Sequence, residues 1–511
     1  MATETSDLRV VRDLLLAGII DEDDVVESNP DQDEDNIVTS TTQQLINGRG
    51  GDDTYIGVGA KIDDFIFAGR DGNGDEGRHV NIVQNFSYAD GDILSLKFED
   101  GYFTGLPQDA GPVGAEFKGA RALADLLLFM NQKDGIKEGL GITIDPADVA
   151  ANTNSAGKVD LTYRAAEAAK TIDGSFVRVE NGHIVINFDD SGTGETVDRE
   201  GNYRTDDVMV VFDKFEARLA AQFAVELGYE NELESSRDSV HIATSDGGTL
   251  DGHHGDNLFI LSNSADTVSV QRSKNTNDEG AHVNIVHGFD LAEDSLFFST
   301  DVKGQFIGGS KNGKFKTFDG AAGLVGVLAT SAVSGVQDGE GDLHFDIQLR
   351  AGDAMTMVLT NTTLADIHAA AEAQTETALV GSGVAASEED VRTTLLEQGA
   401  ETATFASGDG GNVDVLVGFN QDDRLAFDLG SQALDGFDFS RYGDATDSSV
   451  GFSRIDKLGD YLNDLSAADP DNLSAAYFDA DTNSTVLVID ETPGQDGDEL
   501  SIVLWDSGDL I

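Results

Sequence analysis

The chain has 511 residues, of which 95 are acidic and 32 are basic, and its formal net charge is −63 at pH 7. This charge argues against nucleic acids and anionic membranes as partners, because both would repel the chain. The lack of cysteine excludes disulfides, thiolate metal sites and cysteine nucleophiles. Two explanations of the acidic excess stay open: a highly solvated surface, or carboxylates that bind hard cations through oxygen.

Hydrophobic residues form 39% of the chain, which is too large a share for wholesale disorder. There are 58 glycines but only 6 prolines, so the turns are expected to rely on glycine, aspartate and asparagine. A protein without disulfides that works outside the cell needs another staple, and a bound ion can serve as one.

The first segment, residues 1–44, is predicted to hold a short amphipathic helix at Val10–Ile20 followed by an acidic linker. It begins with acidic residues, and Arg12 and Asp13 interrupt its apolar stretch, so it lacks the pattern of a cleavable secretory signal. No run of about 18 apolar residues occurs in the chain, so no membrane-spanning helix is expected.

The strongest local motif is GRGGDDTYIG at residues 48–57. Glycines permit tight left-handed turns in which backbone carbonyls converge on one point, and aspartates add carboxylates to that point. The next turn, GVGAKIDDFIF, keeps one aspartate of this pattern. The expected calcium ligands of the two turns are Gly50, Asp52, Asp53 and Asp64.

Another loop, between residues 71 and 77, places oxygen-bearing side chains at alternate positions. These are Asp71, Asn73 and Asp75, and Gly77 ends the turn. The spacing suits a calcium ion. The alternative is an ordinary solvated turn in which the side chains bond to nearby backbone groups.

An internal triplication organises the chain. The segment GRHVNIVQNFSYADGDILSL from Gly77 returns as GAHVNIVHGFDLAEDSLFFS from Gly280 and, more diverged, as GNVDVLVGFNQDDRLAFDL from Gly411. Each copy contains an alternating apolar strand, an aromatic residue, an acidic turn, and an aspartate before the next strand. The aromatic residues and aspartates are Phe86 and Asp92, Phe289 and Asp294, and Phe419 and Asp423.

Each copy continues with a helical pattern and then two strands joined by an acidic turn. The predicted helices are 120–132, 321–332 and 455–465, and the strand pairs begin at His183, Asp342 and Thr485. Further helical patterns occur at 161–170, 215–227, 364–373 and 387–397.

The second and third copies carry acidic turns of their own. GGTLDGHHGDNLFIL, from Gly247, fits the glycine turn and contributes Asp256. In the third copy Asp479, Asp481 and Asn483 alternate, and Asp490 stands at the twelfth position of a loop like that of an EF-hand. Ser484 replaces the glycine that such a loop needs, and its flanks have strand patterns.

These patterns predict a mainly β fold, with β-roll-like turns and β-sandwich or β-sheet repeats, and with helices packed on the strands. The chain divides into the segment 1–44 and three related units at 45–240, 241–400 and 401–511. The first unit contains a helical insertion.

The glycine–aspartate turns resemble those of the repeats-in-toxin, or hemolysin-type calcium-binding, proteins that type I secretion exports. Each unit has only one or two such turns, so short rolls or isolated calcium turns are expected rather than one long roll. The resemblance implies calcium as the bound ion, an extracellular location, and an uncleaved C-terminal signal read by the type I secretion machinery. The tail DELSIVLWDSGDLI is similar to such a signal.

The function that we expect is structural: a calcium-binding surface-layer or matrix protein that self-assembles into a homo-oligomer or lattice. A cell-surface polysaccharide is a further candidate partner. The chain contains no H-E-x-x-H, G-x-S-x-G or P-loop motif, so we expect no enzyme activity. The alternatives are a calcium-dependent adhesin or binding module, and a secreted hydrolase with an active site within 105–240.

Overall fold

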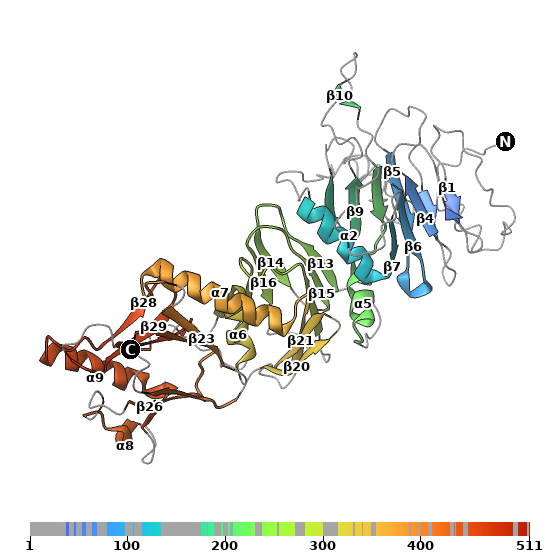
Figure 1. The fold of residues 1–511 in the computed structure, drawn as a ribbon. Helices are drawn as coiled ribbons and strands as arrows, with labels where there is room; N and C mark the ends of the chain where they lie inside the picture. Colours follow the sequence, from blue (N-terminus) through green and yellow to red (C-terminus); the bar gives the residue numbers. More distant parts are fainter. Residues whose placement is uncertain are drawn as a thin grey trace, which may run out of the picture. The chain divides into compact units, whose positions relative to one another are not determined.

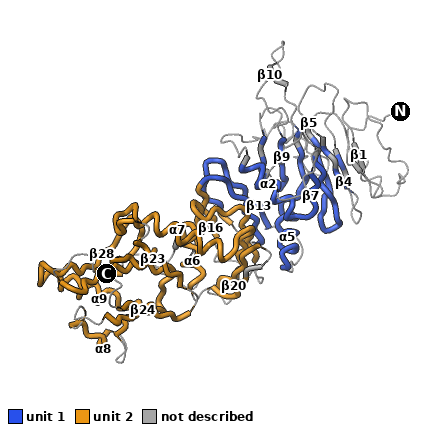
Figure 2. The backbone as a smooth tube through the Cα atoms, in the orientation of Figure 1, with its two compact units in different colours: residues 1–250, 254–264 blue, residues 251–253, 265–511 orange. Residues whose placement is uncertain are grey.

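The computed structural model describes residues 37–39, 45–46, 54–57, 64–68, 79–97, 106, 115–133, 175–180, 182–188, 196–197, 203–204, 208–229, 238–252, 255–270, 282–299, 315–330, 333–339, 341–348, 354–387, 390–396, 399–406, 411–429, 434, 436–442, 448–493, 499–507 and 510–511. The chain forms two compact units, 1–250 with 254–264, and 251–253 with 265–511 (Figure 2). Strands predominate and six α-helices occur among the described residues, which confirms the expected mainly β class.

Two sheets form most of unit 1 (Figure 1). The first has the order β1-β3-β5-β12-β9-β8, and its strands are β1 (Ile37–Thr39), β3 (Thr54–Ile56), β5 (His79–Gln84), β12 (Val208–Phe212), β9 (His183–Phe188) and β8 (Phe176–Glu180). The second has the order β2-β4-β6-β7, with β2 (Leu45–Ile46), β4 (Asp64–Ala68), β6 (Ile93–Lys97) and β7 (Ala115–Lys118). Successive strands from β1 to β6 thus alternate between the sheets, and neighbours among them run parallel.

The remaining elements of unit 1 include two helices that flank these sheets. They are α2 (Ala120–Lys133) and α5 (Glu216–Glu226), with η2 (Tyr88–Asp90) in the turn between β5 and β6. A small antiparallel pair joins β10 (Thr196–Val197) to β11 (Tyr203–Arg204), and β13 (Ser239–Ile242) runs parallel to β15 (Asn257–Ile260). Strand β14 spans Gly248–Gly252.

An aromatic cluster forms the core of unit 1 around Phe86, the aromatic residue of the first repeated segment. Its ring centroid lies 5.2 Å from that of Phe212, 5.3 Å from Phe215 and 5.4 Å from Phe65. Tyr88 meets it edge-on at 4.8 Å. These residues come from both sheets and from the start of α5, so the cluster ties the layers together.

Unit 2 contains a first pair of sheets with strand orders β17-β22-β21-β20 and β16-β18-β19. Their strands are β17 (His282–His287), β22 (Ala354–Thr360), β21 (Asp342–Gln348), β20 (Val333–Gly339), β16 (Asp266–Val270), β18 (Ser295–Ser299) and β19 (Phe315–Asp319). Helix α6 (Gly320–Leu328) follows β19, and helix α7 (Leu364–Ser382) follows β22 and packs on α6.

A second pair of sheets in unit 2 has the orders β23-β25-β30-β29-β28 and β24-β26-β27. The strands are β23 (Val391–Leu395), β25 (Val413–Val417), β30 (Glu499–Leu504), β29 (Ser484–Asp490), β28 (Ala475–Asp479), β24 (Thr402–Ala406), β26 (Arg424–Asp428) and β27 (Ser449–Gly451). The helical elements are α8 (Phe439–Tyr442), η5 (Phe452–Arg454) and α9 (Ile455–Ala468).

Three four-strand runs share one pairing pattern, in which a parallel pair is followed by two antiparallel pairs. They are β5-β12-β9-β8, β17-β22-β21-β20 and β25-β30-β29-β28. In each case the strand order departs from the chain order in the same way, because the last strand inserts beside the first.

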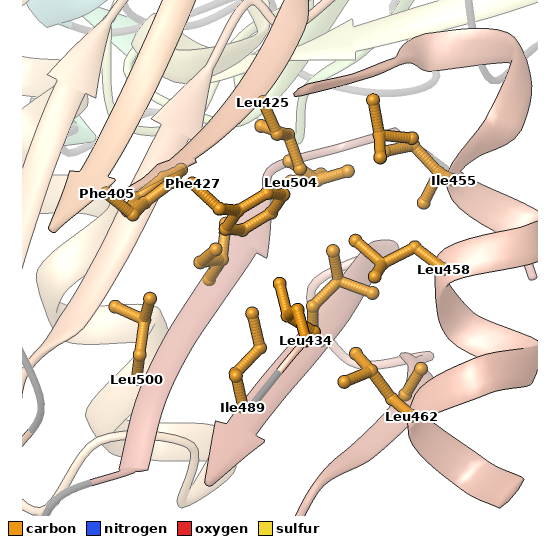
Figure 3. Packing of buried hydrophobic residues seen from close by; sticks show 14 of the residues in the cluster. Phe405, Leu425, Phe427, Leu434, Ile455, Leu458, Leu462, Ile489, Leu500 and Leu504 are labelled. Carbon is orange, nitrogen blue, oxygen red and sulfur yellow. The ribbon is translucent and has the colours of Figure 1, made fainter. Parts of the chain in front are cut away.

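The core between the last two sheets and α9 consists of aliphatic side chains and aromatic rings, among them one stacked pair (Figure 3). Phe405 and Phe427 stack at 5.9 Å, and Leu458 and Leu462 of α9 are fully buried against Ile489. Burial of each leucine removes apolar area worth roughly 1.5–3 kcal/mol from water.

The helices of the repeated pattern are confirmed by α2, α6 and α9, and those predicted at 215–227 and 364–373 by α5 and α7. The helix predicted at 387–397 is wrong, because Val391–Leu395 forms β23, parallel to β25. Its sequence, VRTTL, is rich in β-branched residues that favour a strand. The helices predicted at 10–20 and 161–170 lie outside the described residues.

A side-chain oxygen from a second helix caps the start of a first helix at two places in the chain. In unit 1, Glu226 of α5 accepts backbone N–H bonds from Ala120 (2.5 Å) and Arg121 (2.9 Å). In unit 2, Gln374 of α7 accepts one from Ala322 (2.9 Å). The glycine at the start of each helix has a positive φ: Gly119 precedes α2 and Gly320 is the first residue of α6. A Cβ on either would lie under 3 Å from the capping side chain. Glycine is therefore required at both places.

Candidate functional site

Six of the twelve predicted calcium ligands, Gly50, Asp52, Asp53, Asp71, Asn73 and Asp75, lie outside the described residues. Asp64 begins β4, where it pairs with Leu45 on one side and Ile93 on the other. The five remaining residues, Asp256, Asp479, Asp481, Asn483 and Asp490, are described.

The EF-hand-like loop predicted at 479–490 is wrong. Residues 484–490 form β29, so Asp479 pairs with Ser484 at one end of that strand while Asp490 pairs with Glu499 at the other. A strand rises about 3.3 Å per residue, which separates the two aspartates by roughly 20 Å. They therefore do not share one ion. The alternating apolar residues of 484–490 carried the strand signal that the loop interpretation overlooked.

The turn between β28 and β29 brings Asp479, Asp481 and Asn483 together through hydrogen bonds. Asp479 Oδ1 accepts from the backbone N–H of Asp481 (3.2 Å), and Oδ2 accepts from the hydroxyl of Thr482 (2.6 Å). Asn483, at φ +52°, donates its side-chain amide to Asp506 (2.6 Å). This turn is closed by its own donors, as in an aspartate turn.

Asp490 is buried and serves as a backbone acceptor at the opposite end of β29. Its Oδ2 accepts from Leu473 N–H at 2.8 Å and its Oδ1 from Thr492 N–H at 3.0 Å. Asp256 is buried beside Asp238, whose Oδ1 accepts the backbone N–H of Asp256 at 3.0 Å. In both turns a carboxylate binds the backbone.

The aspartate shared by the three repeated segments has the same place in all of them. Asp92, Asp294 and Asp423 are almost fully buried. Oδ2 of each accepts a backbone N–H from the turn before it, from Ser87 (2.8 Å), Asp290 (2.7 Å) and Asn420 (2.8 Å) respectively. We call this arrangement the carboxylate clamp.

In the clamps of Asp294 and Asp423 the other oxygen reaches the preceding turn of the chain. Asp294 Oδ1 accepts from Asp266 N–H, at the start of β16, at 2.8 Å. Asp423 Oδ1 accepts from Glu401 N–H, just before β24, at 2.9 Å. Each carboxylate thus fastens two consecutive parallel strands of a sheet. Charge-assisted bonds of this kind are stronger than neutral ones.

Burial raises the pKa of Asp294 to about 7 and that of Asp423 to about 6, even though the backbone donors oppose the rise. Neighbouring acids add to it: Asp266 and Asp290 beside the first, Glu401 and Asp422 beside the second. Desolvation of the charged form is the larger cause in both.

A second recurring contact joins the first residue of a central strand to a residue that lies just after the end of the neighbouring strand. His183, Asp342 and Ser484 begin β9, β21 and β29 and are buried. Each accepts the backbone N–H of a residue with positive φ: Lys214 (3.2 Å), Asn361 (2.9 Å) and Asp506 (3.1 Å). We call this contact the strand lock. Sequence alone gave no sign of it, because the three acceptors are chemically different.

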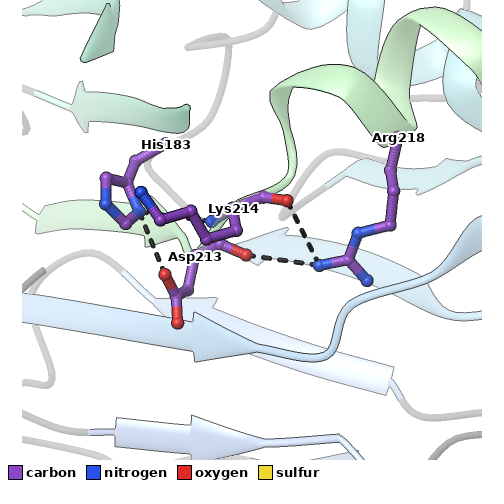
Figure 4. A network of polar contacts seen from close by, with 4 residues as sticks. All are labelled: His183, Asp213, Lys214 and Arg218. Carbon is purple, nitrogen blue, oxygen red and sulfur yellow. Dashed lines mark hydrogen bonds and ion pairs between the residues drawn. The ribbon is translucent and has the colours of Figure 1, made fainter. Parts of the chain in front are cut away.

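In unit 1 the lock belongs to a larger polar network (Figure 4). His183 Nδ1 lies 3.2 Å from the backbone nitrogen of Lys214 and 3.1 Å from Oδ1 of Asp213. Arg218 donates to the carbonyls of Asp213, Lys214 and Phe86. The arginine therefore fastens the turn after β12 to the turn after β5.

A histidine beside a carboxylate is also the arrangement of a general base and its orienting group. Here Asp342 and Ser484 replace His183 in the other sheet pairs and keep the backbone bond. His183 Nδ1 lies within reach of both the Lys214 N–H and Asp213 Oδ1, and Nε2 is buried without a hydrogen-bond partner among the described residues. The backbone bond from Lys214 gives His183 a structural role in the lock.

A small cavity lies in unit 2 beside Trp505, between α6 and the turn after β25. Its lining includes Phe318, Thr330, Phe419 and Asn420, and its volume is about 20 Å³. A cavity of this size holds about one water molecule. It is too small for an organic ligand.

Within the described part of the chain, no group of three or more acidic or histidine side chains is arranged to hold a metal ion. No described helix is long and apolar enough to cross a membrane. Buried aspartates such as Asp294, Asp423 and Asp490 instead accept backbone N–H groups from neighbouring segments of the chain. No family model, curated protein or solved structure matches this chain.

Proposed function

We propose that the chain is a secreted, calcium-binding structural protein of a cell surface or extracellular matrix, built from three related modules that self-associate. The observation that carries the modular part is recurrence: one strand order, one carboxylate clamp and one strand lock occur with each of the three sheet pairs. Contacts repeated at matching positions with different side chains favour a scaffold over a single active site.

Each module, in this proposal, begins as a short parallel roll. Strands β3, β4, β5 and β6 alternate between two sheets and pair only with parallel neighbours on that side. The same alternation runs through β23, β24, β25 and β26. The three four-strand runs then close each roll with antiparallel strands. Such a module buries its apolar faces between two sheets.

Calcium enters the proposal through the acidic glycine turns at residues 48–57 and 71–77. The ligands would be Gly50, Asp52, Asp53, Asp71, Asn73 and Asp75. An ion that binds the folded chain and not the unfolded one adds free energy of folding as its concentration rises. At low cytosolic calcium the acids repel one another and the chain stays competent for export. Outside the cell the ion neutralises them.

The carboxylate clamps restrict where calcium is needed. Asp294 and Asp423 already bind two backbone donors each, so their turns close without an ion. The six ligands proposed above all belong to the first module, and calcium dependence is therefore expected mainly there. Export by the type I machinery and anchoring to a polysaccharide follow only from the resemblance, and both belong to the proposal.

The test measures folding and association of the full chain as calcium changes. Circular dichroism and light scattering are recorded in EGTA and then in millimolar Ca²⁺, with Mg²⁺ at the same ionic strength as control. We expect Ca²⁺ to increase strand content and scattering, and Mg²⁺ to do neither. The pair Asp52→Asn and Asp53→Asn should weaken the response, whereas Asp31→Asn, in the N-terminal linker, should not. Identical spectra and a monomer in all buffers would overturn the proposal.

A further inference from the structure

Two helix pairs in the chain pack on strands that come after them in sequence. The pairs are α2 with α5 in unit 1 and α6 with α7 in unit 2. In unit 1, α5 packs on β13 and α2 packs on β15, and these two strands run parallel. In unit 2, α7 packs on β23 and α6 packs on β25, again a parallel pair. The same helix-on-strand arrangement therefore occurs twice.

One contact fastens the C-terminal end of the first helix in both units. Asn263, three residues after the end of β15, donates its side-chain amide to the carbonyl of Gln132, in the last turn of α2, at 3.0 Å. Asn420, three residues after the end of β25, donates to the carbonyl of Ala329, the residue after α6, at 3.3 Å. The last carbonyls of a helix have no partner within it, so a donor from outside satisfies them.

Other side chains bond the helix pairs to the same strands. Asn131 of α2 is buried and donates to the carbonyl of Leu261, just after β15, at 2.7 Å. In unit 2 the hydroxyl of Thr375, which is buried in α7, lies 3.0 Å from that of Thr393 in β23. Each pair is thus held to the following strands by hydrogen bonds from buried side chains as well as by packing.

Glu216, the first residue of α5, has bonds in two directions. Its backbone N–H donates to the carbonyl of Gly182, in the turn between β8 and β9, at 3.2 Å. Its Oε1 accepts the backbone N–H of Val240 in β13 at 3.2 Å. One residue therefore connects the strands that precede α5 in the chain to the first strand that follows it.

The N-terminal ends of the first helices also depend on other elements. Glu226 of α5 caps α2, and Gln374 of α7 caps α6. The N-cap residue of α6, Asp319, makes no capping bond through its side chain, whereas α7 has a capping box of its own. Helix α6 has only nine residues, and a helix shorter than about 12 residues is marginal in isolation. Its order therefore depends on α7 and on the turn after β25.

We propose that α2 and α6 are conformational couplers: helices whose order depends on the strands that follow them, and which transmit a change in those strands to the strands that precede them. On the preceding side, α2 packs on β7 and β8, and α6 packs on β18, β19 and β20. Coupling of this kind is mutual, so loosening the helix also loosens the following strands. It depends neither on calcium nor on self-association. In a scaffold of repeated modules it makes neighbouring modules hold or lose their order together.

The first experiment disturbs the strand side and measures the helix. Hydrogen exchange of the full chain, followed by mass spectrometry, compares the parent with Asn420→Asp and Gln421→Glu. Both variants add one negative charge to the same turn, but the amide of Asn420 bonds to Ala329, whereas Gln421 is exposed. Aspartate keeps the oxygen that accepts the N–H of Asp422.

We expect α6 to exchange about fivefold faster or more in Asn420→Asp, because a buried hydrogen bond is lost, and at the parent rate in Gln421→Glu. An unchanged rate in α6 of Asn420→Asp, or equal acceleration in both variants, overturns the proposal.

The second experiment disturbs the helix side and measures the strands. Gln374→Ala removes the cap that α7 provides to Ala322, and Thr377→Ala, at an exposed position of the same helix, is the matched control. We expect β23 and β25 to exchange about threefold faster in Gln374→Ala, with Thr377→Ala at the parent rate. Acceleration confined to α6 would show that the helix transmits nothing. Equal acceleration in α9 would show a general loss of stability. Either result refutes the coupling.

Unit 1 allows the same test at an exposed position, where the substitution is expected to leave the fold intact. Asn263→Ala removes the amide that bonds to Gln132 and adds no charge. We expect α2 to exchange about twofold faster or more, less than in the buried case because water replaces the lost donor. Equal rates in α2 of the parent and the variant would contradict the recurrence on which the coupling rests.

Discussion

Helices α6 and α9 follow the β19 and β27 strands of their sheet pairs, yet they differ in how much of their surface is covered. Every residue of α6 is buried except Gly326, and its sequence, GAAGLVGVL, has no charge. In α9 only Ile455, Leu458, Gly459 and Leu462 are buried, and Asp456, Asp460 and Asp464 lie on the remaining surface. Helix α7 packs on α6 (Figure 1), whereas no described helix packs on α9 in this way.

The extent to which neighbouring elements enclose a helix, rather than its position in the repeat, decides its amino-acid composition. A helix enclosed on all sides needs small apolar residues for close approach, while a half-buried one needs a single apolar stripe. The acidic outer face of α9 resembles that of a capping repeat, whose polar surface stops further stacking.

The largest expected effect concerns the buried leucines that both helices have. Leu324 of α6 and Leu458 of α9 are both fully buried. We expect Leu324→Ala and Leu458→Ala to lower the free energy of unfolding by about 2–5 kcal/mol each, because each leaves a cavity in a packed core. Urea denaturation followed by circular dichroism measures both. A loss under about 1 kcal/mol for Leu458→Ala would show that α9 is loosely attached.

Glycine substitutions separate the two helices. A Cβ on Gly323 would lie 2.6 Å from the carbonyl carbon and 2.9 Å from the Cα of Phe318, both backbone atoms. On Gly459 it would lie 2.6 Å from Cγ2 of Ile511 and 3.2 Å from Cβ of Ala476, both side-chain atoms. We expect Gly323→Ala to cost about 1–3 kcal/mol through overpacking. Gly459→Ala should be nearly neutral, because the gain in helix propensity offsets a small shift of Ile511.

Gly381 provides the control for these glycine variants. It lies within α7, and nothing lies within 4 Å of a Cβ placed on it. Gly381→Ala should therefore raise the free energy of unfolding by about 0.5–1 kcal/mol, the usual helix-propensity gain. Equal losses of unfolding free energy in Gly323→Ala and Gly459→Ala would mean that α9 is as tightly enclosed as α6, and would contradict the difference between the two helices.

The two sheet pairs of unit 2 should also respond differently to pH. The pKa of Asp294 is raised to about 7 and that of Asp423 to about 6, each from a usual value of 3.8. A carboxyl with a raised pKa binds its proton more tightly in the folded state. Its contribution to stability is therefore fully present below about pH 4 and is lost as pH rises to the folded pKa.

Urea midpoints measured between pH 4 and pH 8 test this expectation in the variants Asp294→Asn and Asp423→Asn. Each variant should lose part of the pH dependence of the parent chain, over a window that reaches about pH 7 for Asp294 and about pH 6 for Asp423. A variant at exposed Asp366, whose pKa is lowered by bonds from Thr363, should leave this window unchanged. Parallel curves for the parent and the two clamp variants would contradict the assignment.

The sequence predicted the order of elements well because the repeated pattern was long. Apolar spacing at 120–132 and 455–465 located α2 and α9, whose ends differ from the prediction by at most three residues. The segment 387–397 was mistaken for a helix, since its strand depends on parallel pairing with β25, a partner distant enough in sequence that local periodicity does not reveal it.

The site was harder to predict. The pattern located Asp294 and Asp423 as repeated aspartates, but an acidic turn looks the same whether its carboxylates face an ion or a backbone N–H. Only the folded chain places Asp266 N–H against Asp294 and Leu473 N–H against Asp490. The composition gives the number of carboxylate acceptors. The donors are backbone N–H groups, which every sequence has, so the composition does not reveal which donor each carboxylate meets.

A variant at the start of α7 tests whether the cover that α7 provides is what distinguishes α6 from α9. Thr363 and Asp366 form a capping box at the start of α7, in which Asp366 N–H donates to Thr363 Oγ1 at 3.2 Å and Asp366 accepts the backbone N–H of Thr363 at 3.0 Å. Thr363→Ala should destabilise α7 by about 1 kcal/mol. Hydrogen exchange should then quicken in α6, which α7 covers, and stay unchanged in α9. Equal acceleration in both helices would show that the two sheet pairs of unit 2 open together, and the contrast between α6 and α9 would then concern composition alone.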